Sequence, residues 1–234
     1  MFVTTRWSVV LTAGRSDTAH AHAALEKLCR AYWFPLYAYV RRRGYSPADA
    51  EDLTQEFFAR LLERNAVASV APEKGRFRSF LLACMNHFLA EEWHKARAQK
   101  RGGGKVIPLD LQSAETQLGE IPVENFTPEK AFEHRWAITL LEQVYQRLGT
   151  EYRAEGKAML FDALRTTLAG ASNAAPYAEL ARQLDMSEGA VKVAVHRLRQ
   201  RYRALLRDTI ADTVSGPDEV EDELCYLFRT LAGD

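Results

Sequence analysis

The sequence predicts an all-α fold in which a flexible linker joins two small helical domains. Apolar residues recur at three- and four-residue spacing almost throughout, strict alternation is nearly absent, and capping or breaking residues separate the runs. With 234 residues, of which 47% are apolar and 26% charged, the chain is long enough for such domains. Its composition also lies far from that of a disordered chain.

The first domain is expected over residues 1–101 and begins with two helices. A short amphipathic helix over residues 5–13 precedes a long one over residues 18–43. Because proline lacks the backbone donor and clashes with the preceding turn, Pro35 should kink the long helix. Gly44 should end it.

Two more helices complete this domain. Ser46 supplies a capping hydroxyl and Pro47 suits the first helical position, so a helix should start here and reach about residue 64. A loop over residues 65–76 follows. The last helix should run from Phe77 to about residue 100, with a basic far end.

Residues 102–130 are expected to form the linker, since they contain a glycine run and three prolines and lack helical periodicity. The second domain is expected over residues 131–207. It should begin with two helices, over about 129–148 and 151–168.

Residues 176–203 have the pattern of a helix, a tight turn and a second helix. Ser187 is a natural N-cap for the second helix, and Asp185 occupies a turn position that tolerates a left-handed backbone. The stretch 192–207 carries six lysines or arginines and no acid. A charge run is often only a solvated face, but turn, cap and core spacing agree here, so we interpret the element as a DNA-binding helix-turn-helix. The apolar stripe that should face its core comprises Val191, Val195, Leu198, Tyr202 and Leu205.

A second patterned face lies on the helix that starts at Pro47. Its acids share one stripe beside aromatic residues that we expect to be exposed, and such a face suits a basic partner helix. Taken alone, it would more simply be a solvated acidic face. The acids are Asp49, Asp52, Glu56 and Glu63.

The overall charge and the cysteines set further bounds. The formal net charge is zero, but fields are local, so the segregated charges matter more than their sum for nucleic-acid binding. Cys29, Cys84 and Cys225 are far apart and show no metal-ligand spacing, so reduced thiols are expected. No long apolar run or signal peptide is evident, which favours a cytoplasmic protein without a membrane partner.

Three runs carry a family resemblance: YSPADAEDLTQEFFARLL at 45–62, GRFRSFLLACMNHFLAEEWHKAR at 75–97 and YAELARQLDMSEGAVKVAVHRLRQR at 177–201. They resemble regions two and four of the bacterial sigma-70 family. The resemblance is closest to the compact group IV, or extracytoplasmic-function type, RNA polymerase sigma factors, and it covers about 23–101 and 135–207.

The resemblance implies binding partners. Core RNA polymerase would be bound through its beta-prime coiled coil by the first domain and through its beta flap by the second, and promoter DNA would be the other partner. The matching polymerase-binding positions are Asp49, Glu51, Asp52, Gln55, Glu56 and Phe57.

The resemblance also implies two sets of DNA contacts. Region two would open and hold the minus-ten element by stacking and phosphate contacts, through Arg76, Phe77, Arg78, Phe80, Asn86, His87, Lys95, Arg97, Lys100 and Arg101. For Phe77 and Phe80, core packing is the alternative. Region four would read the minus-thirty-five element through Glu188, Lys192, Val193, His196, Arg197 and Arg199.

The chain departs from the family pattern in three places. Val193-Ala194 stands where two polar residues are usual, and Asn86-His87 replaces a common Arg-Asn pair, so the promoter preference cannot be carried over. Residues 149–175 are longer than the compact form, which makes the flap contact less secure than the DNA contact.

Residues 208–234 form an acidic extension beyond the matched segments, with seven acids between Asp208 and Glu223. Helical spacing predicts an amphipathic helix after Gly216-Pro217. The simpler expectation is that it packs on region four as added core. The sharper hypotheses are that its acids screen the basic helix and inhibit the protein, or that it binds a partner such as an anti-sigma factor. The apolar stripe comprises Val220, Leu224, Leu227, Phe228 and Leu231.

We therefore expect a sigma factor without enzymatic activity or cofactor. One alternative is a helix-turn-helix regulator that acts without polymerase. A metal-dependent helical enzyme is a remote third class, because His87 and Glu91 stand four residues apart with His94 nearby.

Overall fold

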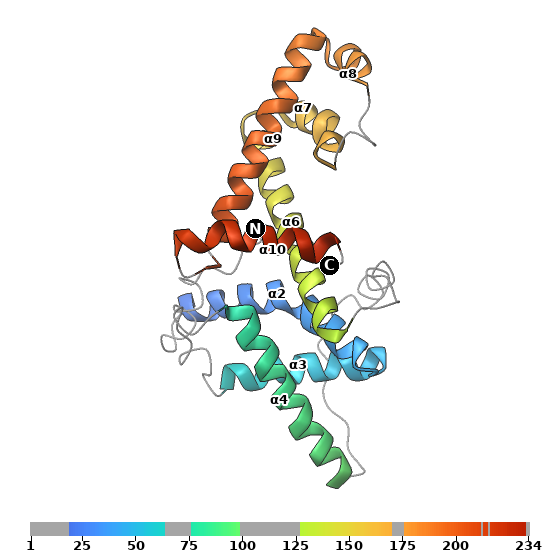
Figure 1. Ribbon diagram of the computed structural model, residues 1–234, viewed down its shortest axis with the longest axis vertical. Coiled ribbons are helices and arrows are strands. Elements are labelled where there is room, and N and C mark those ends of the chain that lie inside the picture. Colours follow the sequence, from blue (N-terminus) through green and yellow to red (C-terminus); the bar gives the residue numbers. More distant parts are fainter. Residues whose placement is uncertain are drawn as a thin grey trace. The chain divides into compact units, whose positions relative to one another are not determined.

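The computed structural model describes residues 19–63, 76–98, 127–169, 176–211, 213–214 and 216–232. These residues form helices and turns and include no strand, which confirms the predicted all-α class (Figure 1). They belong to two compact units. The N-terminal unit comprises Phe2–Thr139 and Ala211–Asp234, and the helix-turn-helix unit comprises Leu140–Ile210.

Helix α2 (Ala19–Arg42) forms the centre of the N-terminal unit. It continues through Pro35, and its buried side chains include Leu36, Tyr37 and Tyr39, none of which is exposed to solvent. The turn that ends it contains Gly44 with φ 93°, a conformation that glycine adopts without strain. The start and the end of this helix are therefore close to the predicted ones.

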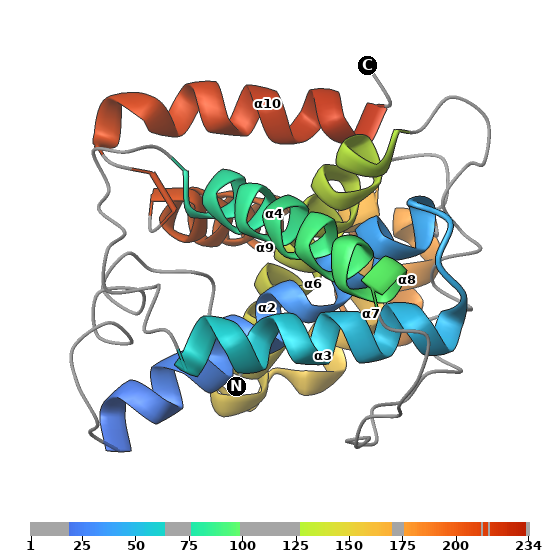
Figure 2. The same cartoon turned by 90° about the horizontal axis from the view of Figure 1, so that it is seen from below.

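Helices α3 (Pro47–Glu63) and α4 (Phe77–Ala98) complete the core around α2. Ser46 caps α3, because its Oγ lies 3.2 Å from the backbone N of Asp49 and accepts that hydrogen bond. In α4, Leu81, Met85 and Leu89 are buried at three- and four-residue spacing. Figure 2 shows α3 and α4 as two separate rods of this unit, as the sequence predicts.

The two helices predicted over 129–148 and 151–168 are a single helix, α6 (Pro128–Ala154), followed by a short one. Gly149 does not end α6; it allows close packing, since a Cβ there would lie only 3.0 Å from Cε1 of Phe161. The chain turns instead at Gly156, where φ is 72°. The predicted break is therefore wrong, because the glycine serves interhelical contact and not a turn.

The helix-turn-helix unit contains the rest of α6 together with α7 (Ala158–Leu164), η3 (Arg165–Ala169), α8 (Tyr177–Leu184) and α9 (Glu188–Ala211). Its predicted core stripe is confirmed at Val191, Val195, Leu198 and Leu205, which are buried. Tyr202 of the same stripe is half-buried.

The acidic extension folds as η5 (Pro217–Glu219) and α10 (Val220–Ala232), as predicted. Its inner face differs from the predicted stripe. Phe228 is 56% exposed, whereas Glu223 has no exposed surface and Leu227 is buried beside it. A carboxylate therefore replaces an aromatic ring on the packed face of this helix.

The helix expected over residues 5–13 lies outside the described residues, as does most of the expected linker, over residues 102–126. The predicted domain boundaries stay a prediction. Within the part of the chain that the structure describes, no helix is long and apolar enough to cross a membrane.

Candidate nucleic-acid interface

The acidic stripe of α3 stands in solvent. Asp49, Asp52 and Glu56 are exposed, while Glu51 and Gln55 are half-buried. Gln55 Nε2 donates a hydrogen bond to Oε1 of Glu51 at 3.1 Å along the helix. Three exposed carboxylates thus lie on one helix, a pattern that suits a cationic partner, and that of Glu56 also pairs with Arg60.

The aromatic residues beside these acids are not exposed, contrary to the sequence-based expectation. Phe57 is 3% exposed and Phe58 is 6% exposed. The ring of Phe57 packs edge-on against Phe58 and against Phe88 of α4, with centroids 5.5 and 5.8 Å apart. Phe57 therefore contributes to the core, since it continues the helical stripe that also contains Thr54 and Leu61.

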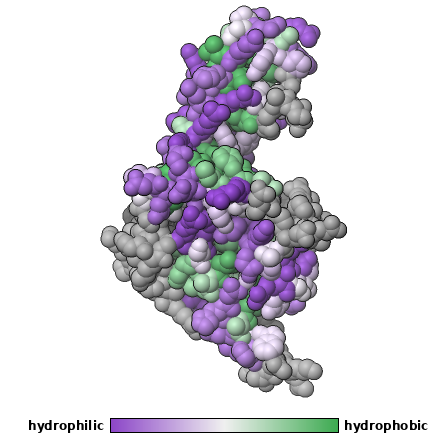
Figure 3. Space-filling view, in the orientation of Figure 1, coloured by the Kyte–Doolittle hydropathy of each residue, from purple (hydrophilic) through white to green (hydrophobic). Residues whose placement is uncertain are grey.

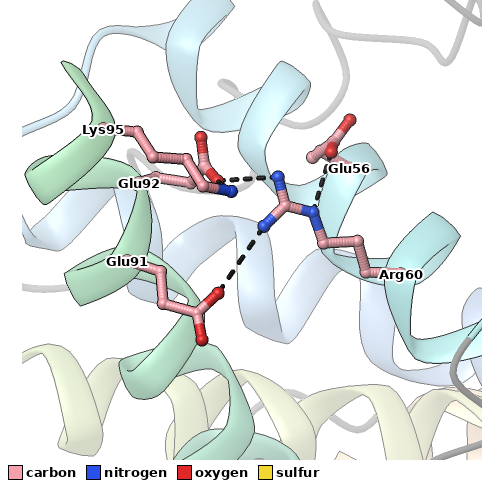
Figure 4. A network of polar contacts seen from close by, with 5 residues as sticks. All are labelled: Glu56, Arg60, Glu91, Glu92 and Lys95. Atoms are coloured by element: carbon pink, nitrogen blue, oxygen red, sulfur yellow. Dashed lines mark hydrogen bonds and ion pairs between the residues drawn. The ribbon is translucent and has the colours of Figure 1, made fainter. Parts of the chain in front are cut away.

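Arg60 links α3 to α4, a role that the sequence analysis did not identify. Its Nη2 lies 2.7 Å from Oε1 of Glu92, and its Nε donates to Oε1 of Glu56 at 2.9 Å (Figure 4). The guanidinium also lies 4.9 Å from the ring centroid of Phe88. Only the Glu56–Arg60 spacing of four residues signalled part of this network in the sequence.

The network shifts the pKa values of its members. Burial raises the pKa of Glu92, but hydrogen bonds from Lys95 and Arg60 outweigh it, so the pKa of this carboxyl lies below its ordinary value. Lys95 Nζ lies 3.1 Å from Oε1 of Glu92. This lysine, predicted to contact DNA phosphates, is thus exposed but already paired.

The start of α4 carries predicted minus-ten residues, and the structure buries two of them. Phe77 is 4% exposed and packs edge-on against Tyr32 at 5.5 Å, and Arg78 is 3% exposed. Phe80 is half-buried beside Phe77. For Phe77 the structure shows the core packing that we had weighed as the alternative.

Arg78 lies among acids and aromatic rings of α6 and α10. Its Nε donates to Oε2 of Glu133 at 2.8 Å, and its Nη1 donates to Oε1 of Glu223. The guanidinium also lies 4.2 Å from the ring centroid of Trp136 and 5.0 Å from that of Tyr226. Its charge is therefore fully engaged within the N-terminal unit.

Arg76 shares the same carboxylate. Its Nη2 forms an ion pair with Oε2 of Glu223 at 2.8 Å. We expected the acidic extension to pack on the helix-turn-helix domain. That expectation is wrong for Glu223, whose partners belong to the N-terminal unit.

Burial and neighbouring charges set the pKa values of this cluster. Burial lowers the pKa of Arg78, but Glu133 and Glu223 outweigh it, so the pKa stands above its usual value. Burial raises the pKa of Glu133, and Arg78 only partly opposes this. The pKa of Tyr226 is raised by burial as well. The arginine thus stays charged at any physiological pH.

Asn86 and His87, the other predicted minus-ten positions on α4, lie in different surroundings. The hydroxyl of Tyr39 donates a hydrogen bond to Oδ1 of the half-buried Asn86. His87 is exposed and lines a pocket of about 150 Å³. That pocket lies between α3 and α4 and is otherwise lined by Phe57, Arg60, Leu61, Cys84, Phe88 and Glu91.

The basic far end of α4 is only partly described. Arg97 lies within the helix, whereas Lys100 and Arg101 lie outside the described residues. Among the described residues, no group of three or more histidines, cysteines or acids is arranged to hold a metal ion.

The turn between α8 and α9 has the geometry that the sequence predicts. Asp185 adopts φ 51° and ψ 47°, the left-handed conformation. Ser187 Oγ accepts a hydrogen bond from the backbone N of Ala190 at 3.2 Å, so it caps α9. A left-handed residue followed by a capped helix fixes the direction in which α9 leaves the turn.

The predicted DNA-reading face of α9 is mostly exposed. Val193 is 50% exposed, and the Nζ of the exposed Lys192 lies 5.9 Å from the ring centroid of Tyr177. On the side seen in Figure 3, hydrophilic residues run along this helix. The exposed members of the predicted set are Glu188, Lys192, Val193, His196 and Arg197.

Two cations of α9 are held by the unit itself. Arg199, a predicted DNA contact, is half-buried and donates from Nε and Nη2 to the carbonyl oxygen of Thr167, at 3.1 and 2.7 Å. Arg201 binds Glu151 of α6 with two hydrogen bonds, at 2.7 and 2.9 Å. The sequence could not show these contacts because the partners are 32 and 50 residues away.

Comparison with known families adds one finding. Residues 28–99 match the family model described as sigma-70 region 2, a segment that covers the larger part of α2 together with α3 and α4. No curated protein and no solved structure matches the chain. The match shows that this chain contains a segment similar to sigma-70 region 2.

Proposed function

We propose that this chain, whose residues 28–99 match sigma-70 region 2, is a group IV sigma factor that carries core RNA polymerase to promoters and helps to open them. The observation that carries the proposal is the presence in one chain of this matched segment and a separate helix-turn-helix whose second helix exposes a cationic face. A sigma factor needs both, because it must grip two promoter elements.

The N-terminal unit would bind both core polymerase and the minus-ten element. In this proposal the exposed acids of α3, chiefly Asp49, Asp52 and Glu56, bind the basic beta-prime coiled coil of the polymerase. His87 on α4 is exposed and would reach the displaced DNA strand. Lys95 is exposed as well and would contact phosphates of the neighbouring duplex, in exchange for its pairing with Glu92. Asn86 would support them from its bond to Tyr39.

The second grip would be α9 in the major groove at the minus-thirty-five element. Lys192, His196 and Arg197 are exposed on this helix, and Val193 offers an apolar contact for a thymine methyl group. The beta flap would contact this unit as well. Arg199 would position α9 through its bonds to Thr167 and would not itself read bases.

The test is co-purification with core polymerase, followed by transcription from a template with minus-ten and minus-thirty-five elements. Asp52→Ala should weaken polymerase binding, and Arg197→Ala should weaken promoter binding while polymerase is still bound. Asp162→Ala, which removes an exposed acid from α7, is the matched control and should change neither.

Binding to duplex DNA without any association with core polymerase would overturn the proposal. That result would favour the alternative, a helix-turn-helix regulator that acts by itself. The match to sigma-70 region 2 argues for the polymerase-dependent role, because a self-sufficient regulator has no need of that segment.

A further inference from the structure

Helix α10 presents an acid and an aromatic ring to the two arginines at the start of α4. Glu223 is fully buried between Arg76 and Arg78, 2.8 Å from the first and hydrogen-bonded to the second. The ring of Tyr226 lies 5.2 Å from the guanidinium of Arg76 and 5.0 Å from that of Arg78. Figure 2 shows α10 running beside the start of α4.

This pairing has the chemistry of a nucleotide. A carboxylate between two guanidinium groups occupies the place that a phosphate would take, because arginine binds both anions through the same fork of donors. An aromatic ring over a guanidinium corresponds to a base stacked on arginine. The acid and the ring lie three residues apart on α10, so one helix face supplies both.

Apart from Glu223 and Tyr226, α10 makes little apolar contact with the rest of the protein. Leu227 is its one buried apolar side chain among the described residues, Phe228 is 56% exposed, and Leu224 is half-buried. The turn before the helix and its first turn are anionic and solvated, since Asp218 and Asp222 are exposed. Its attachment therefore depends on charge as well as on apolar contact, and salt or a polyanion would compete with it.

The arginine site would remain formed without α10. Arg78 keeps the hydrogen bond to Glu133 at 2.8 Å and the ring of Trp136 at 4.2 Å, and both partners belong to α6. Arg76 would instead lose its carboxylate, and its side chain is already 36% exposed. Removal of α10 thus exposes both arginines. Arg78 stays bound to α6, Arg76 loses its carboxylate, and together they can bind a phosphate.

We propose that α10 is a built-in competitor that occupies a single-stranded DNA site formed by Arg76 and Arg78, and that the strand and α10 exclude each other. This regulation rests on the proposed sigma-factor function. It differs from screening of the basic helix α9, because the covered residues lie on α4. Region two would then grip the displaced strand fully only after α10 has left.

The test uses full-length protein and a fluorescent single-stranded oligodeoxynucleotide at low salt, with binding followed by anisotropy. Glu223→Gln removes the competing charge, and Tyr226→Ala removes the stacked ring without leaving a new buried charge. Each should tighten binding, Glu223→Gln by about tenfold if α10 covers the site about nine-tenths of the time. Tyr226→Phe retains the ring and should bind as the wild type does.

Two controls test whether the tighter oligonucleotide binding is due to exposure of Arg76 and Arg78. Asp222→Asn removes one negative charge from the same helix at an exposed position, so its affinity should stay within about twofold of the wild type. Arg76→Ala combined with Glu223→Gln should abolish the gain. If Asp222→Asn tightened binding as much as Glu223→Gln does, general repulsion would explain the result and the proposal would fall.

The proposal also falls if Glu223→Gln and Tyr226→Ala lower the melting temperature while oligonucleotide affinity stays unchanged or undetectable, since α10 is then only a brace. Transcription by the wild-type protein with core polymerase separates the two ideas. Promoter-dependent transcripts together with unchanged oligonucleotide affinity would reject the competitor and leave the sigma-factor function standing. No polymerase association in any variant would reject the function itself.

Discussion

Arg199 on α9 donates two hydrogen bonds to the carbonyl oxygen of Thr167, at 3.1 and 2.7 Å, and so ties the second helix of the helix-turn-helix to the segment that follows α7. The sequence places Arg199 among cations that face DNA. The structure gives it a partner inside its own unit, and a guanidinium already donating to a carbonyl has fewer donors left for a phosphate.

Arg199→Lys should lower the free energy of unfolding by about 1–2 kcal/mol, because a single ammonium cannot reproduce both charge-assisted bonds. Urea unfolding measures the change. Arg203→Lys, at an exposed position of the same helix, is the control and should change stability by less than about 0.5 kcal/mol. If Arg199→Lys weakened DNA binding and left stability unchanged, Arg199 would instead be a DNA-contacting residue.

The Arg60–Glu92 contact should show a measurable coupling between α3 and α4. A double-mutant cycle with Arg60→Ala and Glu92→Ala should give a coupling free energy of about 1 kcal/mol at low salt, decreasing at high salt as the charges are screened. The same cycle with Glu63→Ala, an exposed acid of α3, should give a value near zero. Equal coupling free energies in the two cycles would show that the Arg60–Glu92 contact contributes no specific stabilisation.

Two capping serines should each contribute to stability. Ser46→Ala and Ser187→Ala remove the hydroxyls that accept the backbone N–H groups of Asp49 and Ala190, and each should cost about 1 kcal/mol. Ser79→Ala, at an exposed position inside α4, should be neutral or slightly stabilising because alanine favours helices. Chemical denaturation of the three variants provides the comparison. A loss at Ser79 as large as at the caps would contradict this account.

His134 should make the protein less stable at mildly acidic pH. Burial lowers the pKa of its imidazole below the ordinary value of 6.5, and the neighbouring Arg135 lowers it further. The unfolded chain then binds a proton before the native one does, so the free energy of unfolding falls as pH drops from 6.5 through the native pKa. An NMR titration should place the His134 midpoint below 6.5.

The His134→Asn variant identifies the NMR signal of His134 and measures its contribution to the pH dependence of stability. The difference in unfolding free energy between wild type and variant should shrink as pH falls from about 7.5 to about 5.5, because only the wild type carries this proton linkage. A difference that stays constant over this range would refute the assignment.

Much of the fold followed from local patterns in the sequence. The bounds of α3 and the start of α9 agree with the predictions to within about two residues, because proline and serine mark them locally. The helix break predicted between residues 148 and 151 failed for a nonlocal reason. Whether a glycine ends a helix or admits a neighbouring ring depends on Phe161, which the local pattern does not reveal.

The candidate site likewise contains residues whose surroundings follow from local spacing and residues whose surroundings depend on other helices. Exposure of Asp52, Lys192 and Arg197 follows from helical periodicity and is confirmed. Burial of Phe57 and Arg78 depends on residues of other helices, so no spacing rule could show it. The sequence shows Glu223 only as one of seven acids in the extension. An isolated buried carboxylate is costly, and the two arginines that the fold brings to Glu223 make its burial tolerable.

The contact between Gly149 and Phe161 has a consequence for sequence variation. A methyl group at 149 would require the ring at 161 to give way by a few tenths of an ångström, and Tyr145 and Tyr152 pack against that ring at 5.5 and 5.8 Å. The two positions should therefore change together among related chains, with a larger residue at 149 accompanied by a smaller one at 161.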